Sequence, residues 1–109
     1  MNIVMASEVQ AILSRWQLYE LSASQVHSWA EDRYCVSGWE CESEAVTAVL
    51  HLLDTMNMNL VVPDDIATLS NAIFTRDFES VLETYFQQVD IAERKRELRD
   101  IPFYARFCD

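Results

Sequence analysis

The chain has 109 residues, half of them hydrophobic, and a formal net charge of -10. This length fits one domain, residues 1–109, with enough apolar residues for a compact core. A surface this acidic disfavours binding to nucleic acid or anionic lipid, which depends on Lys and Arg, and it favours a basic partner.

Targeting and membrane signals are missing from the sequence. No apolar run reaches the roughly 18 residues that suggest a membrane helix. The N-terminal MNIVMASEVQ lacks the basic and apolar regions of a secretory signal. We therefore expect a cytoplasmic protein whose cysteines, Cys35, Cys41 and Cys108, are reduced thiols.

Apolar spacing predicts helices along most of the chain. Ser7 is placed to cap a first helix, with Gln10 at the third position of a capping box. Ser22 and Gln25 repeat this pattern at the start of a second helix, which ends by Tyr34.

A break is expected after the second helix, at Val36-Ser37-Gly38-Trp39, because Gly38 gives the backbone unusual freedom. Ser43 is placed to cap a third helix, with Glu44 in its first turn, where a negative charge suits the helix dipole. The run Pro63-Asp64-Asp65 is a start signal for a fourth helix.

The clearest periodicity lies between Phe78 and Val89, and it predicts a helix with one apolar face. Residues 90–100 are expected to form a charged helix or its continuation, with Arg94-Lys95-Arg96 on a solvated side. Pro102 is expected to stop a helix. The sequence therefore predicts an all-α protein, a compact bundle of about five amphipathic helices with short connections.

Acidic residues gather around the only glycine, in EDRYCVSGWECESE, residues 31–44. Residues 1–75 contain ten acidic residues against two basic ones. Within this stretch Trp39 is either an aromatic anchor for a basic partner or a plug that folds inward. The candidate partner-binding residues are Glu31, Asp32, Trp39, Glu40, Glu42, Glu44, Asp54, Asp64 and Asp65.

Patterns for catalysis and metal binding are weak. Cys35 and Cys41 are separated by five residues, outside the usual spacing of zinc ligands. His27 and His51 are typical helix histidines. The acidic pairs carry no sign of the walled cleft that separates the pKa values of catalytic carboxylates. We therefore expect no enzymatic activity, no metal and no cofactor.

Three phrases resemble small bacterial immunity proteins: LSASQVHSWAE, LLDTMNMNLVVPDDIATL and DIAERKRELRDIPFYARF. Such proteins are the cytosolic antidotes of contact-dependent inhibition, colicin-like and other polymorphic toxins. The resemblance implies a non-enzymatic inhibitor that binds a cognate toxin domain, often a basic nuclease, and covers its active site or a neighbouring surface. It supplies no binding motif, so the candidate residues rest on the acidic positions of this chain.

Two other functions fit the same sequence. An acidic helical adaptor or regulator, or a mimic of nucleic acid, would bind other proteins without catalysis. A mimic would bind many nucleic-acid-binding proteins, whereas an immunity protein would bind one. An enzyme with a Cys–His or carboxylate site is the third hypothesis, and alanine substitution of its Cys and His residues would test it.

Overall fold

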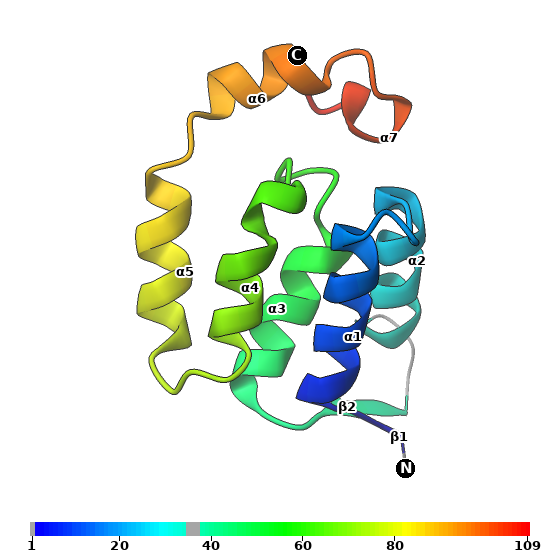
Figure 1. Cartoon of the computed structure of the whole chain (residues 1–109), viewed down its shortest axis with the longest axis vertical. Coiled ribbons are helices and arrows are strands. Elements are labelled where there is room, and N and C mark those ends of the chain that lie inside the picture. The colour runs from blue at the N-terminus through cyan, green and yellow to red at the C-terminus, as the bar shows by residue number, and fades with distance from the viewer. Residues whose placement is uncertain (1, 35–37) are drawn as a thin grey trace.

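The computed structural model describes residues 2–34 and 38–109 (Figure 1). Cys35 and the first half of the predicted break, Val36 and Ser37, lie outside the described residues. In chain order the elements are β1 (Asn2–Val4), α1 (Ala6–Gln17), α2 (Ala23–Tyr34), β2 (Trp39–Cys41), α3 (Glu44–Asp54), the 3₁₀ turn η1 (Pro63–Asp65), α4 (Ile66–Ala72), α5 (Phe78–Gln87), α6 (Ile91–Leu98) and α7 (Pro102–Ala105).

The mostly helical structure confirms the helical prediction, with two differences. Over the described ranges there are seven α-helices instead of about five, because the C-terminal third is divided into three. A two-stranded parallel sheet is also present, with Val4 opposite Cys41 and Asn2 opposite Trp39. Strands of three residues are too short to display the alternation by which a strand is recognised in a sequence.

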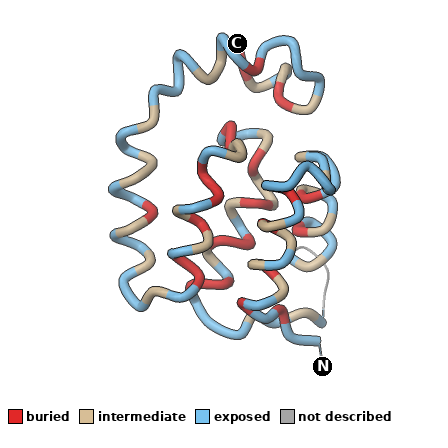
Figure 2. Tube along the Cα trace, in the orientation of Figure 1, coloured by how far each residue is buried: buried red, intermediate tan, exposed pale blue. Residues whose placement is uncertain are grey.

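Helices α3 and α4 lie between α5 on one side and α1 and α2 on the other (Figure 1). The sheet lies at one end of the molecule, and α6 and α7 lie across the opposite end (Figure 1). Buried positions concentrate on α1, α3 and α4 (Figure 2). The largest fully buried side chains are Leu13, Leu50, Leu53, Met56, Leu60, Ile66, Leu69, Val4, Val9, Val26, Val46 and Val49.

Two of the predicted helix caps are confirmed. The Ser22 backbone N–H donates to the Gln25 side chain at 2.8 Å, and the Gln25 N–H donates to Ser22 Oγ at 3.2 Å, which makes a complete capping box. Ser43 Oγ accepts from the Val46 N–H at 3.2 Å at the start of α3. Each cap joins residues three apart, so the signal is local.

The Ser7 cap was wrong, because α1 begins one residue before it and Met5 holds the cap position. The Glu8 carboxylate accepts from the Met5 N–H at 3.2 Å. The Ala6 N–H donates to a carboxylate oxygen of Glu42 at 2.6 Å, across 36 residues of chain. A carboxylate from beyond β2 therefore adds to the local capping by Glu8 and satisfies a second N–H at this helix N-terminus.

The C-terminal third departs most from the predictions. Pro102 begins α7 instead of stopping a helix, since a missing N–H costs nothing at the first helical position. The helix Phe78–Gln87 is present, but Leu82 is the only buried member of its apolar face. Helix α5 packs on α4 at the edge of the molecule. Its remaining apolar side chains are therefore only half-buried.

A buried carboxylate joins the C-terminal third to the rest. Asp65 is fully buried and forms a two-pronged ion pair with Arg94 of α6, with N–O distances of 2.7 and 2.8 Å. It also accepts from Tyr85 Oη at 2.5 Å and from the Val62 N–H at 2.9 Å. Arg94 also donates to the Leu60 carbonyl at 3.0 Å. Arg94 is thus a structural residue and was wrongly expected on a solvated side.

A second cluster of buried residues lies under α6 and α7. It contains Leu60, Leu98, Tyr104 and Cys108. The Tyr104 hydroxyl donates to the Val61 carbonyl at 2.6 Å. Burial, followed by the charge of Asp65, raises the pKa of Tyr104 well above its ordinary value. Desolvation and the hydrogen bond to Asp65 raise the pKa of Tyr85 in the same direction.

Replacing Arg94 with Met should destabilise the fold by about 3–5 kcal/mol, because it leaves the buried Asp65 charge without a counter-ion. Urea denaturation followed by circular dichroism measures this. The matched control is Arg96→Met on the same helix, where the side chain is exposed and the change should stay within about 0.5 kcal/mol. Equal denaturation midpoints for the two variants would show that the ion pair contributes little.

The two raised tyrosine pKa values predict a loss of stability in alkali. A raised pKa means that the fold favours the neutral phenol, so this stabilisation is fully present below pH ~10 and disappears as pH rises through the folded-state values. Tyr104→Phe should cost about 1 kcal/mol at neutral pH and make the alkaline loss shallower. Urea midpoints across the alkaline range test this. Tyr19→Phe, at a residue 86% exposed, should keep the wild-type slope; a wild-type slope in Tyr104→Phe would contradict the assignment.

Candidate functional site

The predicted partner-binding residues do not form a single patch. Glu40, Glu42 and Glu44 lie in or beside β2 at the sheet end of the molecule, and all three are exposed. Asp64 and Asp65 lie in η1, which Arg94 connects to α6 at the opposite end (Figure 1). The predicted partner-binding residues at β2 and those in η1 therefore lie at opposite ends of the fold.

Asp65 is not available to a partner, and its prediction as a contact residue was wrong. Its side chain is 0% exposed, and its oxygens are fully occupied by Arg94, Tyr85 and Val62. The adjacent Asp64 is exposed, and its role as a contact residue stays a prediction. A buried charge of this kind must be paired and hydrogen-bonded to be tolerated, and Asp65 meets both conditions.

Arg33, the only base between residues 16 and 75, is covered by two aromatic rings. Its guanidinium carbon lies 4.5 Å from the ring centroid of Trp29 and 5.0 Å from that of Trp39. Trp39 is half-buried and packs against the main core. Of the two interpretations of Trp39, its packing is closer to the inward one, and the positive charge of Arg33 is held against the tryptophans.

A hollow of about 490 Å³ lies beside Glu42 and Glu44 at the sheet end of the molecule. We call it the Phe74 hollow, because Phe74 lines it with 65% of its surface exposed. Phe74 lies just beyond the end of α4 and is exposed, whereas Ala72 and Ile73 before it are buried. Phe74 was not among the predicted partner-binding residues. The lining residues are Ala6, Glu42, Ser43, Glu44, Ala45, Ile73, Phe74, Thr75, Arg76 and Phe78.

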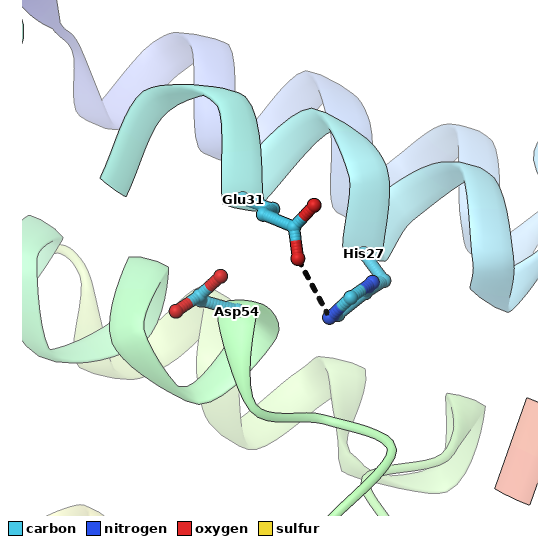
Figure 3. Close-up of side chains that lie close together, drawn as sticks. All are labelled: His27, Glu31 and Asp54. Carbon is cyan, nitrogen blue, oxygen red and sulfur yellow. Dashed lines mark ion pairs between the residues drawn. The ribbon is translucent and has the colours of Figure 1, made fainter. Parts of the chain in front are cut away.

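A second cluster joins α2 to the end of α3 (Figure 3). His27 and Glu31 lie one turn apart on α2, with His27 Nε2 4.0 Å from Glu31 Oε2. Asp54, the last residue of α3, lies across from them on the facing helix (Figure 3). One ligand atom from each of the three side chains lies within 4.8 Å of the others. Asp32 is exposed one position beyond Glu31.

The sequence did not reveal this cluster, because its members are far apart along the chain. Spacing of four residues places His27 and Glu31 on one face of a helix, which is a usable local signal. Asp54 lies 27 positions after His27 and is brought in only by the packing of α2 against α3. Cys35, one of the two cysteines considered as zinc ligands, lies outside the described residues.

Comparison with protein families, curated proteins and solved structures gives no match to this chain. The resemblance to immunity proteins therefore stays a prediction. Among the described residues, no helix has both the length and the apolar character needed to cross a membrane.

Comparing substitutions at Glu42 and Glu40 tests whether the Glu42 carboxylate stabilises the fold. Glu42→Ala should destabilise the fold by about 1 kcal/mol, because the Ala6 N–H at the start of α1 loses its acceptor. Glu40→Ala, on the same short segment and exposed, should change stability by less than about 0.5 kcal/mol. Urea denaturation of both variants measures this, and a Glu40 effect as large as that of Glu42 would contradict the capping role.

Proposed function

We propose that this chain is a non-enzymatic inhibitor of the immunity type, which binds and neutralises a basic, nuclease-type toxin domain in the cytoplasm. The observation that carries the proposal is the pairing of exposed acids with an exposed aromatic at the sheet end. Glu42 and Glu44 line the same hollow as Phe74, and Glu40 is exposed on β2. Arg33, the nearest base in the sequence, is held between Trp29 and Trp39.

This arrangement suits a basic protein surface better than an anionic one. Nucleases carry Lys and Arg to hold phosphate, and a patch of carboxylates complements that surface. Long-range attraction of this kind accelerates encounter and weakens as salt screens it. An aromatic side chain that enters the partner slows dissociation, since aromatic residues dominate the energetics of interfaces. Phe74, with Glu42 and Glu44 beside it, has the chemistry for both roles.

Arg76 restricts the orientation in which the partner can bind. It lines the same hollow and places a positive charge among the carboxylates. A uniformly basic partner would meet repulsion there, so we expect the partner to present an acidic or neutral group at this position. Such mixed charge fixes the register of a complex and helps to exclude wrong partners.

The proposal predicts separate effects of charge and aromatic substitutions on the kinetics of binding. The partner is captured from the source organism at low salt, and its toxicity is tested by expression with and without this chain. Glu40→Gln/Glu44→Gln should then lower the association rate on the order of tenfold at low salt. Phe74→Ala should raise the dissociation rate about tenfold or more. Surface plasmon resonance measures both rates.

The matched control is Glu79→Gln/Glu83→Gln, which removes two exposed carboxylates from α5 instead. An equal effect of the two double variants would exclude the sheet end as the binding surface. An association rate that is unchanged between about 50 and 500 mM salt would remove the electrostatic basis of the proposal. Capture of several unrelated nucleic-acid-binding proteins, none of them toxic, would favour a nucleic-acid mimic instead.

A further inference from the structure

The cluster of His27, Glu31 and Asp54 has the donor set of a metal site. It offers one imidazole nitrogen and two carboxylate oxygens from two packed helices. The three side chains lie close together between α2 and the end of α3 (Figure 3). His27 is the better buried of the ion-paired residues, with 18% of its side chain exposed. Two helices therefore fix the positions from which the three ligands approach.

We propose that His27, Glu31 and Asp54 bind a divalent transition-metal ion, with Zn²⁺ the best fit, and that water completes the coordination. Three protein ligands and one water are the usual set of an open tetrahedral zinc site. An imidazole ligand favours Zn²⁺ and its transition-metal neighbours over Mg²⁺ and Ca²⁺, which prefer oxygen ligands alone. This site is independent of the proposed function.

The distances leave room for an ion between the three groups. Zinc bonds to nitrogen and oxygen of about 2.0–2.2 Å place two tetrahedral ligands roughly 3.3–3.6 Å apart. The present separations between the ligand atoms are all within 4.8 Å. Closing this difference takes shifts of about 1 Å in the ligand atoms, a size that rotation of the Glu31 and Asp54 side chains can supply.

The ion pair between His27 and Glu31 is long, and a second contact restrains the His27 ring. At 4.0 Å, His27 Nε2 and Glu31 Oε2 are too far apart for a hydrogen bond. The imidazole also packs edge-on against Phe103 of α7, with ring centroids 5.5 Å apart, which restrains its orientation. Two carboxylates brought this close repel each other, and a divalent ion between them converts that repulsion into attraction.

Isothermal titration of the chelator-treated chain with ZnCl₂ tests the proposal. We expect one zinc ion per chain, reversal by chelator, and a higher melting temperature in the presence of zinc. His27→Ala should weaken binding about 100-fold or more, and Glu31→Gln and Asp54→Asn should each weaken it at least tenfold. Loss of zinc affinity with unchanged circular dichroism separates a ligand from a residue needed for folding.

Two matched controls decide between this site and general attraction to an acidic surface. His51→Ala removes the other histidine, whose ring packs against Tyr34, and Asp32→Asn removes the acid next to Glu31. Both controls should bind zinc as the wild type does. If His27→Ala does not fold, the ring resonances of wild-type His27 should still shift on zinc addition while those of His51 do not. No binding, equal binding by all variants, or shifts at His51 alone would overturn the proposal.

Discussion

The fully buried carboxylate of Asp65 is the constraint on which the C-terminal half of the molecule depends. It receives donors from the backbone before η1, from α5 and from α6. Because an unpaired charge at this depth is costly, these segments must come together or the fold loses several kcal/mol, on the order of a large part of its stability. The same arginine holds the carbonyl of Leu60, whose backbone lies in the left-handed region at φ 55°. A branched side chain rarely adopts that conformation, and the burial of Leu60 offsets its strain.

Features that depend on residues close together in the chain could be predicted from the sequence. Features that depend on residues far apart could not. The caps at Ser22 and Ser43 join residues three apart, so composition and spacing identify them. Asp64 and Asp65 are identical neighbours in the sequence, yet one is exposed and the other fully buried. What distinguishes them is an arginine 29 residues further along, and no local pattern records such a pairing. The acidic character of the candidate surface was therefore predictable, whereas its division between two ends of the fold, the exposed Phe74 and the cluster around His27 were not.

The carboxylates have different environments at the two ends of the molecule. At the α6 end a single carboxylate is enclosed and neutralised, and it holds segments together. At the sheet end the carboxylates remain in water, where each costs little and acts over a distance. Glu42 does both, since it satisfies the N-terminus of α1 and lines the Phe74 hollow.

The docking of α6 and α7 has a kinetic consequence for Cys108. This thiol is buried in the cluster with Leu60, Leu98 and Tyr104, and its Sγ donates to the Tyr104 carbonyl at 3.3 Å. The Cys108 thiol becomes accessible to reagents only when α6 and α7 detach from the rest of the molecule. This can happen whether or not the main core stays folded. Its rate of alkylation therefore reports how often this segment opens, as a local equilibrium separate from global unfolding.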